Sequence, residues 1–278
     1  CCSTDNAHMS DSLHDWLARM QRRHPATIEL GLERVRSVAG RMQLEKPAPC
    51  VITVGGTNGK GSTVAFIEAI ARAAGLRVGA YTSPHLLRYN ERVRIDGIDA
   101  ADADLVAAFE AVEAARGDIS LTYFETGTLA ALWLFARAGL DLAILEVGLG
   151  GRLDAVNIVD PDVAVITTVD LDHMEWLGED REDIGVEKAG IARAWTPLVL
   201  GDDEPPSSVL RRAYAIGASA LRMGCDFFVD RASGGAGWQW REPGFVLDLP
   251  MPALGAPVQL RNAAVAIAAL RASPLDIP

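Results

Sequence analysis

The sequence lacks the features that would assign a protein to a membrane, to export or to nucleic acid. No run of 18 apolar residues occurs, and the start has no basic segment leading into an apolar run, so neither membrane spanning nor export is predicted. The net charge of -11 disfavours binding to DNA or anionic lipid, which depends on basic charge. We therefore expect a cytoplasmic, monomeric protein whose partners are small molecules, with no nucleic-acid and no membrane partner.

The four cysteines show no CxxC spacing, so neither a disulfide framework nor a zinc site is predicted. Internal repeats and low-complexity tracts are also missing from the sequence. Hydrophobic residues make up 49% of the chain and charged residues 23%, a balance that suits a large buried core. We expect residues 10–272 to form one domain, residues 1–9 to be a tag or a disordered start, and residues 273–278 to begin a linker.

Strand-like and helix-like segments alternate along the chain. Short apolar runs without charge are typical of strands covered on both faces, and apolar residues three and four positions apart are typical of helices. The alternation predicts an α/β fold in which helices flank a mostly parallel sheet, and the hairpin-like stretch 238–249 predicts a small antiparallel edge. The expected strands are 50–54, 77–81, 142–147, 163–168 and 198–200, and the expected helices are 11–20, 32–40, 64–75, 103–115, 126–138, 184–194 and 259–272.

The strongest chemical signal is a glycine-rich loop, residues 55–63, between an expected strand and an expected helix. Its backbone N–H groups can converge on an anion, the helix N-terminus adds partial positive charge, and Lys60 can reach terminal phosphates. Gly61 stands between Lys60 and Ser62, which departs from the ordinary Walker A spacing. We interpret the loop as a triphosphate site. A plain glycine-rich turn with a solvent-exposed lysine is the alternative.

This loop resembles the phosphate-binding loop of the Mur ligase superfamily, whose members make amide bonds through acyl phosphates. Further motifs, in the expected order, are similar to the folate branch of that family, the folylpolyglutamate and dihydrofolate synthases, rather than to its cell-wall branch. The resemblance runs from Leu13 to about Ala272 and implies a P-loop NTPase-like Mur ligase central domain. The motifs are Thr82-Ser83-Pro84-His85-Leu86 with 88–93, Leu145 to Ala155, Leu171-Asp172-His173 with 176–178, and Glu187 to Ile191.

The resemblance implies an ATP-dependent ligase of folate biosynthesis. Such an enzyme joins L-glutamate to dihydropteroate, to the γ-carboxyl of a folate, or to both, through an acyl phosphate, and the residues leave open which reaction occurs. Family members also carry a C-terminal Rossmann-like domain with ATP and glutamate contacts; we find no counterpart of it in these residues and expect weak or absent ligation by this chain alone. A nucleotide- or pterin-binding module without turnover and a Mur-type amide ligase for another substrate are the alternatives.

The resemblance implies two magnesium sites, with Ser83, Glu146, His173 and a carbamylated Lys188 as ligands, and makes Lys60, Lys188 and His173 catalytic. The residues by themselves support these roles unequally. A carboxylate at the end of a buried strand is costly without a metal or a partner, which favours Glu146, with a salt bridge as the alternative. A lone histidine is more often structural, and Lys188, near an expected helix start, would ordinarily be solvated. A buried lysine with a depressed pKa would react most readily with carbon dioxide.

The resemblance also assigns residues to the two organic substrates. Phe124 can stack on a flat heterocycle, with core packing as the alternative, and Asp154 can accept hydrogen bonds from an amino-pyrimidine edge. Asn262 stands where the family contacts adenine, although many members have a histidine in that helix and this chain has none. The implied ATP residues are Thr57, Asn58, Gly59, Lys60, Gly61, Ser62 and Asn262, and the implied pterin residues are Thr27, Ile28, Glu29, Leu30, Thr122, Tyr123, Phe124, Glu125, Leu153, Asp154 and Ala155.

Overall fold

The computed structural model describes residues 11–23, 29–231 and 237–277. The expected tag at residues 1–9 and two of the expected pterin residues, Thr27 and Ile28, lie outside the described residues. Within the described ranges, no helix has the length and apolar character needed to cross a bilayer.

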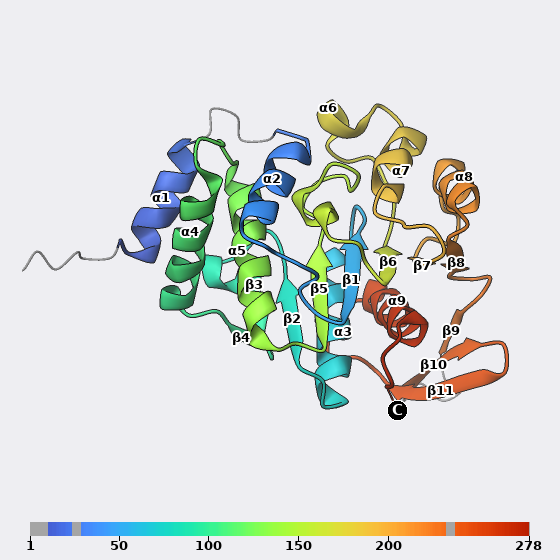
Figure 1. Cartoon of the computed structure of the whole chain (residues 1–278). Helices are drawn as coiled ribbons and strands as arrows, with labels where there is room; N and C mark the ends of the chain where they lie inside the picture. The colour runs from blue at the N-terminus through green and yellow to red at the C-terminus, as the bar shows by residue number, and fades with distance from the viewer. Residues whose placement is uncertain (1–10, 24–28, 232–236, 278) are drawn as a thin grey trace, which may run out of the picture.

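Eight strands form one sheet in the order β4-β3-β2-β5-β1-β6-β7-β8 (Figure 1). From β2 to β8 in that order every neighbouring pair is parallel, which confirms the predicted mostly parallel sheet. Strands β1, β5 and β6 are buried along their whole length, which is why their sequences are continuous apolar runs. The strands are β1 (Cys50–Gly55), β2 (Val78–Tyr81), β3 (Val93–Ile95), β4 (Ile98–Asp99), β5 (Leu142–Glu146), β6 (Val163–Ile166), β7 (Pro197–Leu200) and β8 (Ser219–Arg222).

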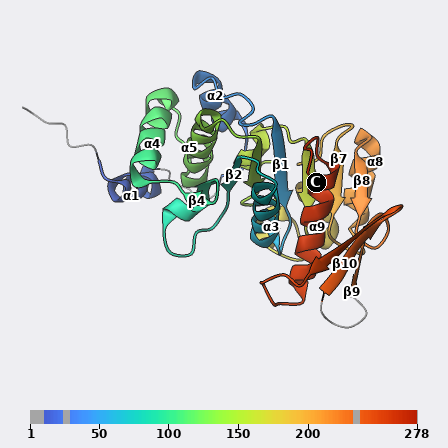
Figure 2. The same cartoon turned by 90° about the horizontal axis from the view of Figure 1, so that it is seen from below.

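Helices cover both faces of this sheet. On one face α3 and α9 pack side by side (Figure 2), and their apolar residues form one core cluster with side chains of β1 and β5. The other long helices cover the opposite face, whose cluster includes Trp16, Phe109 and Leu129. The helices are α1 (Leu13–Arg23), α2 (Glu33–Arg41), α3 (Lys60–Ala73), α4 (Asp102–Arg116), α5 (Tyr123–Ala138), α6 (Met174–Leu177), α7 (Arg181–Ala189), α8 (Ser207–Ile216) and α9 (Val258–Ala272), with the 3-10 turns η1 (Tyr89–Arg92) and η2 (Ala155–Ile158).

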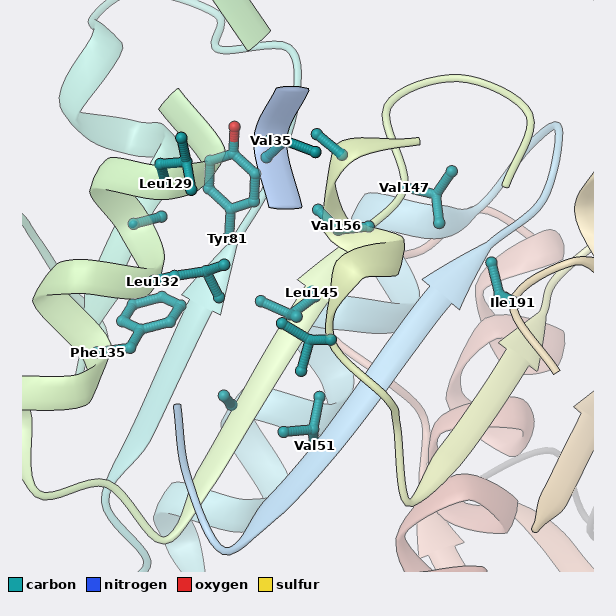
Figure 3. Packing of buried hydrophobic residues seen from close by; sticks show 14 of the residues in the cluster. Val35, Val51, Tyr81, Leu129, Leu132, Phe135, Leu145, Val147, Val156 and Ile191 are labelled. Carbon is teal, nitrogen blue, oxygen red and sulfur yellow. The ribbon is translucent and has the colours of Figure 1, made fainter. Parts of the chain in front are cut away.

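The packing of α5 on the sheet fixes the ends of two strands. Figure 3 shows Tyr81 from β2 and Leu145 from β5 in one cluster with Leu129 and Leu132 from α5. All four side chains are at most 1% exposed, and burial of each contributes about 1.5–3 kcal/mol. The carboxyl ends of β2 and β5 are therefore held in a fixed position relative to the first turn of α5, which carries expected site residues.

The antiparallel strands do not lie where the sequence predicted them. The predicted hairpin is formed by β10 (Gly237–Glu242) and β11 (Phe245–Pro250), but with β9 (Phe228–Arg231) it makes a separate three-stranded sheet. Trp240 anchors this sheet to α9, because its buried indole Nε1–H donates to the carbonyl oxygen of Ala264 at 3.1 Å. The antiparallel edge of the main sheet is β3 with β4, strands too short to show a period in the sequence.

Two functional helices begin earlier than the apolar pattern predicts. α3 begins at Lys60 rather than near 64, and α7 covers Arg181–Ala189 rather than 184–194. Their first turns are polar or glycine-containing, so apolar periodicity does not reveal them. The Asp180 carboxylate caps α7 by accepting the Asp183 N–H at 2.8 Å. Lys188 consequently stands in the last turn of a helix, not at its start.

Candidate active site

The site is built at the carboxyl ends of the parallel strands β2, β5, β1 and β6, where α/β proteins place their ligands. The loops after these strands surround a cavity of about 370 Å³. Residues expected to contact phosphate, metal and pterin meet in this one cavity. Its lining consists of Glu29, Leu30, Gly31, Lys60, Ser83, Pro84, Arg92, Thr122, Phe124, Glu125, Gly148, Leu149, Leu153, Asp154, Ala155 and His173.

The glycine-rich loop after β1 is held against the segment after β6. The N–H groups of Thr57 and Asn58 donate to the carbonyl and hydroxyl oxygens of Thr168 at 2.8 and 3.0 Å. The helical ladder of α3 starts where Thr63 N–H donates to the Gly59 carbonyl at 2.9 Å. The N–H groups of the first turn before Thr63 therefore have no helical acceptor and are available to an anion. Thr57 and Asn58 shape the loop, and the start of α3 offers the donors.

Lys60 is the first residue of α3 and lines the cavity. Its Nζ donates to the carbonyl oxygens of Gly56 and Thr57 at 2.9 and 3.1 Å. The side chain is half-buried and fixed over the loop, so the alternative of a plain turn with a solvent-exposed lysine does not describe it. An ammonium group at the mouth of a helix N-terminus reinforces the preference of that terminus for anions.

The start of α9, which carries Asn262, contacts the glycine-rich loop; the expected contact of Asn262 with adenine stays a prediction. Gly59 has a left-handed φ of 87°, and a Cβ there would stand 2.5 Å from the Oδ1 of Asn262. Asn262 is buried, and its Nδ2 donates to Gln259 Oε1 at 3.0 Å. Gln259 in turn donates from Nε2 to Ser62 Oγ at 3.3 Å. The structure thus brings together Gly59, Ser62 and Asn262, which lie about 200 positions apart in the sequence.

Replacing Gly59 with alanine is expected to destabilise the chain by about 1–3 kcal/mol, because the new Cβ needs a left-handed backbone and displaces a buried, hydrogen-bonded asparagine. Urea unfolding measures the change. The control is Gly40→Ala, in α2, where a Cβ meets nothing within 4 Å and alanine should instead stabilise by about 0.5–1 kcal/mol. Equal stability of wild type and Gly59→Ala would contradict the described contact between the loop and α9.

Glu146 is the last residue of β5 and is buried. Ser83 N–H donates to its Oε2 at 3.1 Å, and a Cβ added at Gly61 in α3 would stand 3.9 Å from the same oxygen. Burial raises the pKa of the Glu146 carboxyl to about 7, although the Ser83 N–H and the Lys60 charge oppose this. Glu146 has no ion-pair partner among the described residues, so the salt-bridge alternative does not hold.

A magnesium ion fits beside Glu146 when phosphate and water oxygens complete its shell. Mg²⁺ usually takes one or two carboxylates from the protein and the remaining ligands from substrate phosphates and water. In the described part of the chain, no three His, Cys, Asp or Glu side chains stand close enough to hold a metal on their own. One buried carboxylate without an ion pair, beside Ser83 and a phosphate loop, is the donor set that a nucleotide-borne cation needs.

Lys188 is only 2% exposed, so the alternative of an ordinary solvated lysine does not hold. Burial and the nearby charge of Lys60 lower the pKa of its ammonium to about 8, while Asp172 opposes the shift. Within the described ranges this ammonium makes no hydrogen bond and no ion pair. The helix α7 that carries it is fixed by the neighbouring Glu187, whose carbonyl accepts the Arg152 N–H at 2.8 Å. A buried cation without a direct partner is energetically costly.

His173 lines the cavity from the segment before α6. Its φ of 47° is left-handed, its side chain is 49% exposed, and its Nε2 lies 3.6 Å from Asp172 Oδ1. A histidine that supports a core would be buried, so the structural alternative does not fit. The side chain is accessible to a ligand in the cavity.

The segment 122–125, which was expected to contact the pterin, contains the residues that cap the N-terminus of α5. Thr122 and Glu125 form a capping box, in which Thr122 N–H donates to Glu125 Oε2 at 2.8 Å and Glu125 N–H donates to Thr122 Oγ1 at 3.1 Å. Arg34 holds the second Glu125 oxygen at 3.1 Å. Tyr123 packs edge-on against Tyr89, with centroids 5.8 Å apart, and does not line the cavity.

Asp154 and Phe124 form the wall after β5. The buried Asp154 carboxylate accepts the N–H groups of Gly148, Leu149 and Val156 at 3.0, 2.9 and 3.0 Å, so it holds the loop as well as facing the cavity. Burial raises its pKa to about 6. The Phe124 ring is half-buried and lies so close to Gly148 that a Cβ there would be 2.7 Å from it. Phe124 therefore presents part of a ring to the cavity and is not a plain core residue.

Arg92 lines the cavity but was not among the residues expected in the site. It lies within the motif 88–93, which is the signal that could have found it, whereas its position between Tyr89 and Tyr123 exists only in the fold. Leu149 and Gly31 were missed as well, because lining by an apolar or glycine residue leaves no chemical mark in a sequence.

The Mur ligase middle domain matches residues 54–270. The chain belongs to the Mur ligase family. The match includes the phosphate loop, Glu146 and Lys188, and it confirms the predicted α/β architecture.

Curated relatives place this Mur ligase chain in the folate branch. It is 52% identical to the dihydrofolate synthase/folylpolyglutamate synthase of Escherichia coli (strain K12) over 95% of this chain and 62% of that protein. It is 47% identical to the enzyme of the same name from Haemophilus influenzae, over 95% of this chain and 59% of that protein. The chain thus spans about three-fifths of the length of these relatives. The resemblance to the folate branch rather than the cell-wall branch is confirmed.

Solved structures of relatives agree in fold and carry ligands. E. coli FolC in complex with DHPP and ADP matches with a TM-score of 0.92 and 51% identity, over 97% of this chain and 64% of that one. A bifunctional folylpolyglutamate synthase/dihydrofolate synthase with Mn, AMPPNP and L-glutamate bound matches with a TM-score of 0.89 and 51% identity, over 97% and 64% of the two chains. The first of those proteins thus holds ADP with DHPP, and the second holds Mn with AMPPNP and L-glutamate.

Proposed function

We propose that this chain is the nucleotide- and pterin-binding part of an ATP-dependent ligase that joins L-glutamate to dihydropteroate, to the γ-carboxyl of a folate, or to both. The observation that carries the proposal is the shared cavity. Lys60 from the phosphate loop, Ser83 beside the buried Glu146 carboxylate, and Phe124 from the aromatic wall surround one space. A phosphate donor and a flat heterocycle bearing a carboxylate can therefore meet there.

The proposed chemistry needs no protein nucleophile. A carboxylate oxygen of the pterin substrate attacks the γ-phosphorus of ATP, ADP leaves, and a carboxyl-phosphoryl anhydride forms. The amine of glutamate then attacks the activated carbonyl carbon, inorganic phosphate leaves, and the amine proton is lost. Lys60 and the N–H groups at the start of α3 stabilise the charge that builds on the transferring phosphoryl group. Exclusion of water from the cavity protects the anhydride.

Divalent metal enters this scheme through Glu146, Ser83 and His173. Magnesium, when bound there, would supply positive charge that neutralises the charge of the phosphate oxygens. Glu146 supports this role because it is buried and has no ion-pair partner among the described residues, and the exposed His173, which lines the cavity, supports a second site. The raised pKa of Glu146, about 7, means that metal affinity should increase as the pH rises through that value, because the ligand is the carboxylate.

Lys188 is proposed to act as a carbamate. The ammonium first loses one proton, the neutral amine then attacks the carbon of carbon dioxide, and a C–N bond forms with release of a second proton. The buried cation is thereby replaced by an anionic carbamate, whose oxygens would hold the second magnesium. The lowered pKa, about 8, supports this because a substantial fraction of the amine is neutral near pH 7 to 8. The Lys60 ammonium, which contributes to lowering that pKa, would favour the product carbamate for the same electrostatic reason.

The pterin is proposed to lie between Phe124 and the segment Leu153, Asp154 and Ala155, with Glu29 and Leu30 closing the other side. Phe124 offers a partly exposed ring for stacking. Asp154 has already accepted three N–H groups, so at most part of its acceptor capacity remains for an amino-pyrimidine edge. Thr122 and Glu125 support the wall through the cap of α5, and Tyr123 supports it from behind.

Calorimetric titration tests the proposal. Wild type should bind magnesium-AMPPNP first and then bind dihydropteroate in its presence. Lys60→Ala should weaken nucleotide binding by about 10- to 100-fold, because a charge-assisted contact to phosphate contributes about 1.5–3 kcal/mol. The control Lys46→Ala removes a lysine that pairs with Asp162 outside the cavity and should leave both affinities unchanged.

The outcomes separate the competing functions. Binding of a UDP-sugar in place of dihydropteroate would favour a cell-wall ligase. A module without turnover would be favoured by a different result: this chain binds both ligands, but a full-length relative with the same site residues does not ligate glutamate. For these 278 residues alone we expect binding with weak ligation, since the family draws its glutamate contacts from a second domain. Absence of any heat with magnesium-AMPPNP would refute the nucleotide site itself.

A further inference from the structure

Arg92 is a cationic side chain in the cavity that the proposed chemistry has not used. It ends η1 immediately before β3 and lines the cavity with Lys60 and Phe124. Its Nε–H donates to His85 Nδ1 at 2.8 Å, and it forms no ion pair with any described carboxylate. Arg94, two positions later in β3, differs, because its guanidinium pairs with Glu68 at 2.8 Å.

The Arg92 guanidinium is fixed in place by neutral groups. Its Cζ lies 5.5 Å from the ring centroid of Tyr89 and 5.6 Å from that of Tyr123, distances at which an aromatic ring attracts a cation. The His85 ring, which accepts the Nε–H, also lies 5.9 Å from Tyr89. A guanidinium has five N–H donors, and this anchoring uses one of them. The terminal N–H groups are left for a ligand.

The position of Arg92 suits a carboxylate on its way to the γ-phosphate. Its charge acts on the Glu146 carboxyl at the end of β5 and on the hydroxyls of Tyr81 and Tyr123, so it stands between the strand end and the aromatic wall. In the proposed function the flat heterocycle occupies the aromatic part of the cavity, and the reacting carboxylate must approach Lys60. Arg92 and Lys60 line the same cavity, so a carboxylate that approaches Lys60 is within the field of the Arg92 guanidinium.

We propose that Arg92 binds the reacting carboxylate of the pterin substrate and offsets its repulsion from the phosphates of ATP. This role rests on the proposed function. Guanidinium suits it better than ammonium, because its planar fork matches a carboxylate and it stays charged at any pH that the protein survives. His85 and the two tyrosines are positioning residues, since they hold the fork without contacting the substrate.

The test compares two ligands on Arg92→Gln in the presence of magnesium-AMPPNP. One ligand is dihydropteroate, and the other is the same molecule with its carboxylate replaced by a carboxamide. We expect the dissociation constant of dihydropteroate to rise about 10- to 100-fold, the loss that accompanies removal of a hydrogen-bonded charge partner, and that of the carboxamide to stay unchanged. The matched control is Arg88→Gln, on the same loop but 68% exposed and paired with Asp102; it should change neither.

Other outcomes overturn the role. If Arg92→Gln weakens the binding of both ligands equally, Arg92 only supports the packing of Tyr89 and Tyr123. If it weakens AMPPNP and leaves dihydropteroate unchanged, Arg92 serves a nucleotide phosphate instead. Should Arg92→Gln not fold, Arg92→Lys gives the same comparison with the charge retained, and a selective though smaller loss for dihydropteroate is then expected. A wild-type chain that binds neither pterin refutes the proposed function, and this role with it.

Discussion

Replacing Lys188 with methionine will raise the free energy of unfolding of this chain by about 3 kcal/mol at pH 7 in the absence of carbon dioxide. The fall of the lysine pKa from 10.5 to about 8 corresponds to about 3 kcal/mol, at about 1.4 kcal/mol for each pH unit. Methionine is similar in length, carries no charge and suits a buried position. Urea unfolding of the two proteins measures the difference.

The same comparison has a predicted pH dependence. Between pH 8 and 10.5 the unfolded lysine binds a proton that the folded lysine has lost, so the stability of wild type rises with pH in this window. Below pH 8 the ammonium is charged in both states and the full cost is present. The advantage of Lys188→Met should therefore be constant below pH 8 and disappear as the pH approaches 10.5. Lys46→Met, which removes an ion pair with Asp162 at 2.6 Å, should give no stabilisation.

In the presence of carbon dioxide, wild type should bind magnesium-AMPPNP more tightly than Lys188→Met does, although it is the less stable of the two proteins without carbon dioxide. Bicarbonate is expected to strengthen magnesium-AMPPNP binding by wild type, because the carbamate adds an anionic ligand near the phosphates, and to leave Lys188→Met unchanged. Isotope-labelled bicarbonate followed by carbon NMR would identify the carbamate directly. A variant less stable than wild type at pH 7, or one that still responds to bicarbonate, would show that Lys188 is neither strained nor modified in the way we propose.

Replacing Glu146 with glutamine is the second change with a large expected effect. Metal-dependent AMPPNP binding should weaken by about 100-fold, the upper end of the effect of losing a metal-supporting group, since Glu146 is a buried carboxylate beside the start of α3. Glutamine keeps the shape of the side chain and the acceptor for the Ser83 N–H. Binding of AMPPNP without metal should change little, so titrations with and without magnesium separate the two effects.

The free energy of unfolding of Glu146→Gln should increase, whereas its metal-dependent AMPPNP affinity should decrease. The pKa of Glu146 rises from 4.5 to about 7 on folding, so between these pH values the folded state binds more protons and wild type loses stability as the pH rises. Above pH 7 the loss is complete, and Glu146→Gln should be about 3 kcal/mol more stable than wild type. Glu68→Gln is the control, because Glu68 is buried but paired with Arg94, and its removal should destabilise. If Glu146→Gln is destabilised like Glu68→Gln, Glu146 has a structural partner and the metal assignment fails.

The sequence alone determined the parallel sheet, the phosphate loop and the family resemblance. Each of these is a local property: a buried strand such as β1 is a continuous apolar run, and the loop 55–63 carries its glycines, Lys60 and hydroxyl residues within nine positions. The starts of helices were harder to predict, because the first turns of α3 and α7 contain glycine or charged residues in place of apolar residues.

Tertiary structure decided the environment of each side chain. The segment around Lys188 has the composition of a solvated helix, and only packing of α7 against the loop after β5 buries its ammonium. Thr122 and Glu125 turned out to cap α5, and Asn262 meets Gly59 only because α9 returns to α3. Arg92 gained its place in the cavity from η1, β3 and two tyrosines brought together by the fold. Burial and the proximity of charges set these roles. Both depend on contacts between residues that are distant in the sequence, and a local stretch of sequence does not predict such contacts.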